Sequence, residues 1–473
     1  MASEESGFSK NYLHLRHEKA GFLDLINLLF YRKSKAEGVK FLDRPVQRKE
    51  EELEYRWVVF ISIMLQKLLK AVEKPLAWIG DLVETWLNLS AYSNFFVFLW
   101  NFLQGKVKAD KDSPTFLSII GNLDKRVELD KSIRHKDVRY NSALSMMAAK
   151  ASYENRAYIE SVVTNRWKME FLGSFDFWNE YQEKATTQAF MLRDPESELI
   201  LVAFRGTETF DADAWSTDCD FSWYELHGMG KAHFGFLKAL GLQPKTGWPK
   251  DLPTQQNRSL AYYHLRSHLK TILKENHRAR VLITGHSLGG ALAVLFPALL
   301  AFHGEEEVLE RVEGVYTFGQ PRVGDKEFGK CMEGVFRKFG IPYHRFVYCN
   351  DIVPRLPYDS SAFLFKHFGT CLYYNSFYQG KVVKEEPNKN YFSPLWAIPK
   401  IINAVWELVR SFIMPYMKGP EYKESSALLV LRFLGLVIAG IPAHSPQEYG
   451  NCTRLGSPDV YHPDTSSPNF HQT

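Results

Sequence analysis

The sequence predicts an α/β protein built on a mostly parallel sheet, and three observations carry that prediction. From about residue 111 onward, short β-branched apolar runs alternate with longer helical patterns, as in a parallel sheet covered on both faces by helices. Residues 280–296 read as a buried strand, a tight turn flanked by glycines and an apolar helix. With 45% hydrophobic and 24% charged residues, the 473-residue chain is globular rather than disordered.

Composition narrows the classes of partner. Aromatic residues make up 14% of the chain, which favours contact with apolar ligands or a membrane interface. The net charge of +4 is too small to indicate a nucleic-acid partner. The N-terminus is acidic and polar, unlike a secretory signal. The odd number and scattered spacing of the cysteines indicate a reducing compartment. The scattered cysteines suggest neither a disulfide framework nor a zinc site: Cys219, Cys331, Cys349, Cys371 and Cys452.

Residues 1–110 differ from the rest of the chain and predict an apolar, mostly helical extension broken by Pro75. Its most apolar part, Thr85 to Gly105, carries no charge and approaches the ~20 residues of a membrane span. Polar residues such as Asn94 and Asn101 interrupt it. We favour insertion into a membrane or droplet interface, with a true span and helices packed on the soluble domain as alternatives.

The elements of residues 111–455, the predicted main domain, follow in order. The pattern of residues 140–163 predicts a helix. The pattern of residues 197–208 predicts a strand that ends in a turn, and that of residues 260–277 predicts an amphipathic helix. After the turn at Ser287, three further segments are strand-like: 312–325, 343–357 and 372–383.

A second apolar region, at about 378–443, is predicted as a helical insertion. Four prolines together with Arg410 and Arg432 argue against a simple span, so amphipathic helices near the mouth of the site are expected. The tail, 456–473, is rich in Ser and Pro and is expected to be disordered.

The turn inside residues 280–296 indicates a nucleophile. Gly285, His286, Ser287, Leu288 and Gly289 spell G-x-S-x-G between a strand and a helix, the pattern of an exposed serine on a strained turn. Glycines on both sides of the serine permit a sharp turn with closely packed backbone. The alternative is an ordinary glycine-rich bend that contains a serine.

A serine nucleophile requires a base, and the base requires an orienting acid, in the chain order Ser, acid, His. Asp351 is the best acid, because it directly follows an apolar β-rich run; the alternative is a turn-capping role. Asp325 and Asp359 also lie in predicted loops, but the strand before Asp351 is clearer.

Two histidines after Asp351 compete for the role of base. His444, in a loop before a short helix, is preferred over His367, which sits between apolar residues at a strand-like position. His286 is expected to stabilise the turn, because neighbours on a sharp turn point apart. His233 lies upstream and does not fit the order.

An oxyanion requires two hydrogen-bond donors. The backbone N–H of Leu288 is one candidate, and Thr207, in the turn after the strand 197–204, is the other; the alternative for Thr207 is a plain strand-end turn. The segment that follows predicts a lid over the site or, alternatively, a surface loop packed by its aromatics: Phe210, Trp215, Phe221 and Trp223.

Four motifs in this order, "FRGTE", "GHSLGGALA", "TFGQPRVGD" and "NDIVPRLP", resemble the class 3 (fungal-type) lipases of the α/β-hydrolase fold. The resemblance covers about residues 140–375 and resumes at "AHSPQEY". "MAAKASYEN" and the long apolar extensions look like plant oil-body lipases that hydrolyse triacylglycerol on lipid droplets. The sequence departs from the family between Tyr378 and Ala443, before the base.

The resemblance implies a triad of Ser287, Asp351 and His444, with Thr207 and Leu288 at the oxyanion hole. The spacing of His444 and Tyr449, which recurs in the plant relatives, supports the base. It also implies hydrolysis of triacylglycerol, and of di- and monoacylglycerol, without metal or organic cofactor.

The expected location is the lipid droplet and the endoplasmic reticulum membrane, with the catalytic domain facing the cytosol. The alternatives are a phospholipase A1 or galactolipase of the same family and, from a different class, a non-catalytic membrane scaffold.

Overall fold

The computed structural model of the chain describes residues 9, 11–30, 42–43, 53–89, 94–252, 258–359, 365–391 and 393–461.

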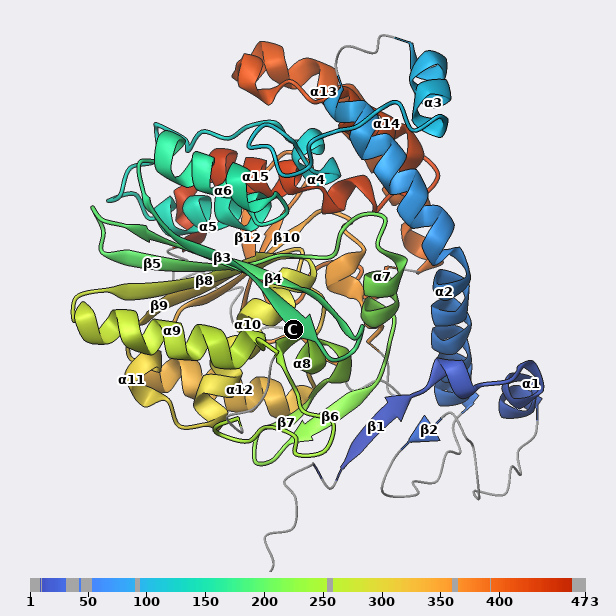
Figure 1. Cartoon of the computed structure of the whole chain (residues 1–473), viewed down its shortest axis with the longest axis vertical. Coiled ribbons are helices and arrows are strands. Elements are labelled where there is room, and N and C mark those ends of the chain that lie inside the picture. Colours follow the sequence, from blue (N-terminus) through green and yellow to red (C-terminus); the bar gives the residue numbers. More distant parts are fainter. Residues whose placement is uncertain are drawn as a thin grey trace, which may run out of the picture.

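A central eight-stranded sheet organises the molecule (Figure 1), with the strand order β12-β11-β10-β9-β8-β5-β4-β3. Its middle strands are mutually parallel, whereas β3 and β4 at one edge and β12 at the other are antiparallel to their neighbours. The predicted mostly parallel sheet is therefore confirmed. The strands are β3 (Glu170–Asn179), β4 (Lys184–Asp194), β5 (Leu199–Phe204), β8 (Arg280–His286), β9 (Val312–Phe318), β10 (Tyr343–Tyr348), β11 (Thr370–Tyr374) and β12 (Gly380–Val383).

Helices cover both faces of this sheet because alternate residues of its strands point to opposite sides. In β5, Ile200 and Val202 join one core, and Leu201 and Ala203 join the other. The first core contains side chains of α8 (Phe234–Leu240), α9 (Ala261–Glu275), α10 (Leu288–Phe302) and α12 (Lys326–Phe339). The second contains side chains of α5 (Tyr140–Ala151), α6 (Arg156–Ser161) and α15 (Pro446–Leu455).

The N-terminal region is not only helical. Strand β1 (Tyr12–Leu15) pairs with β2 (Leu42–Asp43) and with β6 (Trp223–Leu226), which in turn pairs with β7 (Gly230–His233). These four strands form a second sheet. The sequence pattern missed β1 because its partner lies about two hundred residues away: Tyr12 stands opposite Tyr224.

Helix α2 runs without interruption from Leu53 to Asn88, so the predicted break at Pro75 is wrong. Proline removes one backbone hydrogen bond, but α2 is held along its length by α1 (Phe22–Phe30), α7 (Ala212–Asp218) and α4 (Ile119–Leu123). Packing of this kind outweighs the local preference of a single residue.

The uncharged run 85–105 forms the end of α2 and helix α3 (Phe95–Leu103), and residues 90–93 lie outside the described residues. Asn94 caps α3, and Phe95 contacts Trp86 edge-on at 5.2 Å between ring centroids. Over the described ranges, no helix combines the length and apolar character that crossing a membrane requires.

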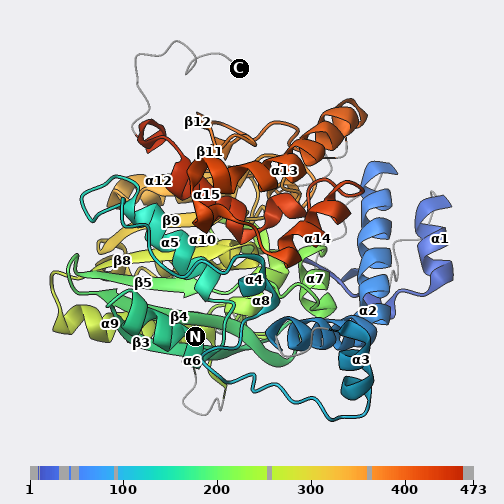
Figure 2. The same cartoon turned by 90° about the horizontal axis from the view of Figure 1, so that it is seen from above.

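The predicted insertion begins with a strand, since β12 (Gly380–Val383) closes the edge of the sheet. Two helices follow, α13 (Ala397–Lys418) and α14 (Ser426–Gly435), which lie near α15 in Figure 2. The predicted disordered tail begins with an ordered turn at Pro458–Tyr461, where the Tyr461 hydroxyl lies 2.6 Å from Ser142 Oγ. Residues 462–473 lie outside the described residues.

Candidate active site

Ser287 occupies the turn between β8 and α10 in a conformation that serine rarely adopts, with φ 58° and ψ −131°. A Cβ on Gly285 would stand 2.1 Å from the backbone of Gly289, and one on Gly289 would stand 2.2 Å from the Phe204 carbonyl oxygen. Both glycines are therefore required by close backbone packing, which holds the strained serine in place.

Asp351 and His444 are hydrogen-bonded, with 2.8 Å between His444 Nδ1 and Asp351 Oδ2. Asp351 is fully buried just past the end of β10. Its Oδ1 accepts the N–H of Val353 at 2.9 Å, and its Oδ2 also accepts the hydroxyl of Tyr449. The carboxylate is thus fixed on both oxygens and orients the imidazole.

Ser287 follows β8 and Asp351 follows β10, so both lie at the carboxyl ends of parallel strands on either side of β9. The N–H of Ser287 donates to the Phe318 carbonyl at the end of β9, at 2.9 Å. A Cβ on the next residue, Gly319, would lie 2.8 Å from His444 Cε1 and 2.9 Å from Asp351 Oδ2. Within the described part of the chain, the other ring nitrogen of His444, Nε2, is buried without a hydrogen-bond partner.

His286 bridges the serine turn to the His444 loop. Its Nε2 lies 3.0 Å from the His444 carbonyl oxygen, which can only accept, so Nε2 carries the proton. Its Nδ1 therefore accepts the hydroxyl of Tyr153 at 2.9 Å. Burial lowers the pKa of His286 well below its ordinary value, and the neighbouring His444 lowers this pKa further. A neutral imidazole held at both nitrogens positions its neighbours rather than acting as a base.

The loop after β5, which carries Thr207, presses against the serine turn. A Cβ on Gly206 would lie 2.5 Å from the His286 carbonyl oxygen. Thr207 is buried, and Leu288 is the first residue of α10, where backbone N–H groups lack intrahelical acceptors. The two residues expected to supply oxyanion donors thus belong to segments in direct contact.

The competing residues are engaged elsewhere. Asp325 caps α12 by accepting the Phe328 N–H at 2.8 Å, and Asp359 pairs with Lys366 and Lys389. His367 donates to the Pro354 carbonyl at 2.6 Å, and His233 donates to the Asp220 carbonyl at 2.5 Å. Burial lowers the pKa of His233 to about 4.

The segment predicted as a lid is covered by the N-terminal region. Helix α7 packs against α2, and Ser62 of α2 donates to the Cys219 carbonyl at 2.8 Å. Phe221 and Trp223 pack against the apolar cluster of that region: Leu13, Leu15, Ala20, Leu25, Leu28, Val59 and Ile63. Movement of this segment stays a prediction.

A cavity of about 680 Å³ lies between α2, residues 111–120 and the loop after β5. Its walls carry many charged groups, among them Glu154 and Arg205, and Ser287 and His444 do not line it. Burial raises the pKa of Glu154 to about 7. Walls of this kind do not suit an acyl chain. Among the described residues, no group of three or more His, Cys, Asp or Glu side chains is placed to hold a metal ion.

Three residues of the site lie within motifs described above, although no sequence pattern gave them a role. Tyr153 and Gly319 are remote from Ser287 in sequence, and only folding brings them together. Arg355 donates to the carbonyls of Cys349 and Asp351 and thereby holds the acid loop. The place of Arg355 in "NDIVPRLP", next to the predicted acid, is the hint that the sequence offers for this residue.

Comparison with known proteins gives a consistent result. Residues 201–361 match the family described as lipase (class 3). The chain is 40% identical to triacylglycerol lipase OBL1 of Nicotiana tabacum, over 95% of each chain. It is 41% identical to triacylglycerol lipase OBL1 of Arabidopsis thaliana, over 95% of this chain and 96% of the relative. A solved triacylglyceride lipase of Rhizomucor miehei is 25% identical, with a TM-score of 0.36, covering 50% of this chain and 78% of that one.

Proposed function

The chain belongs to the class 3 lipases, and from this premise we propose that it hydrolyses the ester bonds of triacylglycerol at the surface of lipid droplets. Membership of the family makes it a carboxylic ester hydrolase of the α/β-hydrolase fold. The names of its full-length relatives support triacylglycerol as the substrate, and di- and monoacylglycerol follow as products with the same ester bond.

The single observation that carries this proposal is the hydrogen bond between Asp351 and His444 beside the strained turn of Ser287. In the proposed reaction, His444 Nε2 takes the proton of Ser287 Oγ while Oγ attacks the ester carbonyl. The N–H groups of Thr207 and Leu288 stabilise the oxyanion. His444 then protonates the leaving glyceride oxygen, which leaves an acyl-enzyme, and water releases the fatty acid by the same steps.

Asp351 supports both half-reactions by holding the imidazole and stabilising its charged form. Its two oxygens are already occupied by Val353, Tyr449 and His444, so it has no need to move or to take a proton itself. A metal or an organic cofactor has no role in this sequence of steps.

The test is the variant Ser287→Ala. Because the hydroxyl is small, its loss should leave the melting temperature nearly unchanged while kcat falls on the order of 10⁶-fold. A fluorophosphonate probe should label the wild-type chain at Ser287 and leave the variant unlabelled. Full activity in a clean preparation of Ser287→Ala would exclude Ser287, and an unlabelled, inactive wild type would indicate a non-catalytic scaffold.

Substrate class is decided by comparing the purified chain on tri-, di- and monoacylglycerol with phospholipid and galactolipid. We expect turnover on acylglycerols to exceed turnover on the polar lipids. The opposite order would identify a phospholipase A1 or galactolipase that uses the same site.

A further inference from the structure

Helices α13 and α14 are arranged with their polar residues inside and their apolar residues outside. In α13 the buried positions include Glu407, Arg410 and Ser411, and in α14 they include Arg432. Every exposed residue of α13 from 401 to 417 is apolar or tyrosine: Ile401, Ile402, Val405, Val409, Phe412, Ile413, Tyr416 and Met417. Helices on the surface of a water-soluble protein normally show the opposite pattern.

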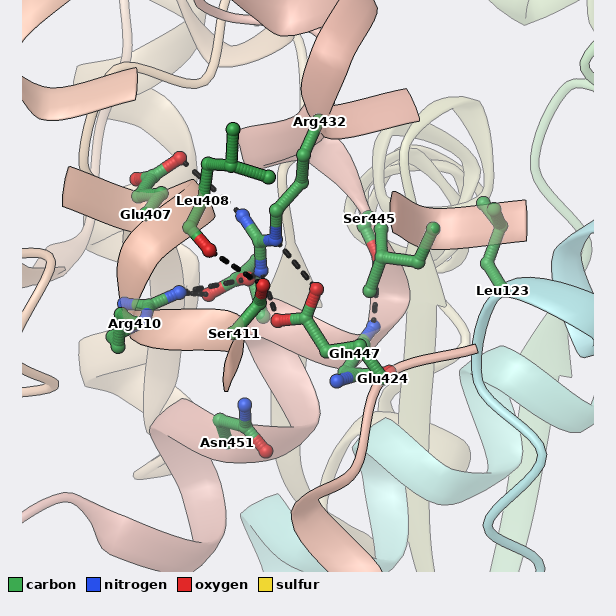
Figure 3. Close-up of polar contacts among 12 residues, drawn as sticks. Leu123, Glu407, Leu408, Arg410, Ser411, Glu424, Arg432, Ser445, Gln447 and Asn451 are labelled. Atoms are coloured by element: carbon green, nitrogen blue, oxygen red, sulfur yellow. Dashed lines mark hydrogen bonds and ion pairs between the residues drawn. The ribbon is translucent and has the colours of Figure 1, made fainter. Parts of the chain in front are cut away.

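Five buried charged residues hold this arrangement, and we call them the ion cluster: Glu407, Arg410, Glu424, Arg432 and Glu448. Figure 3 labels the first four. Arg410 Nη2 lies 2.9 Å from Glu448 Oε2, and Arg432 Nε lies 2.6 Å from Glu424 Oε2. Arg432 also contacts Glu448, and its Nη1 lies 3.6 Å from Glu407 Oε2. The cluster thus joins α13 and α14 to α15.

Two tyrosines connect the ion cluster to the main sheet. Arg410 Nη1 donates to the hydroxyl of Tyr348, the last residue of β10, at 2.7 Å, and that hydroxyl donates to Glu407 at 3.0 Å. The hydroxyl of Tyr378 donates to Glu448 at 2.8 Å. Desolvation opposes the charge on Glu448, but the two arginines outweigh it and lower its pKa to about 2.

The ion cluster fixes which face of the helices points outward. Turning an apolar face inward would leave these charged side chains without their partners, which is strongly unfavourable for a buried charge. The outer face therefore remains exposed in water, with Phe412 at 56%, Ile402 at 63% and Phe433 at 57% of full exposure. Helix α13 is attached along its inner face, so it can offer only this outer face to a partner.

The chemistry of the outer face favours lipid over protein as its occupant. A protein interface normally carries polar groups at its rim. Between residues 401 and 417, by contrast, the outer face has no exposed charged residue. Hydrocarbon satisfies the arrangement directly, because charges turned inward and apolar residues turned outward are what a lipid environment requires.

The α13–α14 pair also lies close to the proposed catalytic site, through the buried side of α14. Helix α14 contacts the turn Pro442–His444, and a Cβ on Gly435 would lie 2.3 Å from Pro442 Cγ. Glu448 of the ion cluster lies one helical turn beyond His444. A lipid surface that covered α13 and α14 would therefore lie close to His444, the proposed base.

A second apolar group occupies the same side of the molecule. Figures 1 and 2 both place α2 and α3 on the side of α14, and α4 contacts both α2 and α14. On α3, Phe96 is 79% exposed and Trp100 is 65% exposed. Aromatic side chains of this kind favour the boundary between water and lipid.

We propose that the α13–α14 pair is a lipid-docking element that enters the surface layer of the substrate itself. The ion cluster supplements the few apolar side chains that these helices bury, and through Glu448 it holds the docked helices in a fixed position relative to His444. This inference rests on the proposed function, since it takes the lipid substrate as the occupant of the outer face.

The test uses Ile402→Glu/Phe412→Glu, which adds two negative charges to the outer face. The matched control is Ser267→Glu/Thr271→Glu, which adds the same charges at exposed positions of α9. Each purified protein is floated with protein-free triacylglycerol droplets coated with phosphatidylcholine, and is assayed on a soluble nitrophenyl butyrate ester. We expect the outer-face variant to lose at least tenfold in droplet binding, with soluble-ester turnover within twofold of wild type. The α9 control should match wild type in both assays.

Droplet binding by Ile402→Glu/Phe412→Glu equal to that of wild type would refute docking and leave the esterase proposal intact. Failure of the wild type to bind protein-free droplets, while it still hydrolyses the soluble ester, would refute lipid as the occupant. If the wild type hydrolysed neither triacylglycerol nor the soluble ester, the proposed function would be refuted. Flotation would still decide whether the outer face binds lipid.

Discussion

At the scale of single residues, His444 and His367 illustrate how contacts separate a base from a structural histidine. His444 has one nitrogen on Asp351 at 2.8 Å, and among the described residues nothing bonds its other nitrogen. His367 is buried against the Pro354 carbonyl, and its Nε2 lies 3.8 Å from Glu386. Burial lowers the pKa of His367 well below its ordinary value.

His444→Ala should therefore reduce kcat about as much as Ser287→Ala, on the order of 10⁶-fold, because the members of a triad act as a unit. His367→Ala should retain measurable turnover and lose mainly stability. Steady-state kinetics on a soluble ester, with melting temperatures for both variants, decide the ranking. If His367→Ala were inactive while His444→Ala kept measurable turnover, His367 rather than His444 would be the base.

The bridge from Tyr153 through His286 to the His444 carbonyl gives a second prediction at this scale. Tyr153→Phe keeps the ring and removes the hydroxyl that donates to Nδ1 of His286. A hydrogen bond of this kind contributes about 1 kcal/mol, so kcat should fall roughly fivefold, with KM for a soluble ester unchanged.

Tyr140→Phe is the matched control, because it also removes a buried hydroxyl, 2.8 Å from Asp194. Asp194 pairs with Leu199, the first residue of β5, and so lies at the end of the strands opposite to Ser287. Tyr140→Phe should lower stability and leave kcat unchanged. Equal kcat values for the two variants would deny Tyr153 a positioning role.

At the scale of elements, the contact between α2 and the segment after the oxyanion loop is unusually close. A Cβ on Gly80 would lie 2.8 Å from Cβ of Phe210, three residues after Thr207. Gly80→Ala should raise the stability of α2 by up to about 1 kcal/mol from helix propensity alone. The added methyl group should also displace Phe210 and lower kcat/KM several-fold.

Gly334→Ala is the control, because it lies in the helix α12 and its added Cβ would meet nothing within 4 Å. It should gain stability without any change in activity. Melting curves and kcat/KM values for the two variants separate the effect of helix propensity on stability from the effect of displacing Phe210 on activity. Unchanged kinetics in Gly80→Ala would show that α2 does not influence the oxyanion loop.

At the scale of the whole molecule, two apolar surfaces compete as the anchor to droplets: residues 85–105 and the α13–α14 pair. We expect a cytosolic catalytic domain with an anchor that enters and leaves the lipid on one side. Deleting residues 85–105 should release a fluorescent fusion from droplets into the cytosol. Because Asn88 also bonds the backbone of Leu117 at 2.8 Å, Phe96→Ser/Trp100→Ser is the gentler variant, and it should reduce droplet binding in the same direction.

Retention of both variants on droplets would show that the α13–α14 pair suffices as the anchor. Protease protection should find the two chain ends on the same side of the membrane. Ends on opposite sides would replace the interfacial anchor with a spanning helix.

Local patterns in the sequence determined the parts of this protein that depend on neighbouring residues. The strand, turn and helix around Ser287 follow from glycine spacing and apolar periodicity, and the structure has the same order of elements at 280–302. The mostly parallel sheet follows from alternating strands and helices. Asp351 was predicted as the acid for the same reason, because it directly follows a clear strand.

Tertiary structure alone decided the features that depend on partners far away in the chain. No local pattern pairs Tyr12 with Tyr224 or places Tyr153 against His286. Arg410 and Arg432 indicated in the sequence only that a simple span was unfavourable; which side of each helix faces inward depends on Glu448, supplied by α15. A buried charge is stable only where its partner is, and a sequence does not show where distant partners meet.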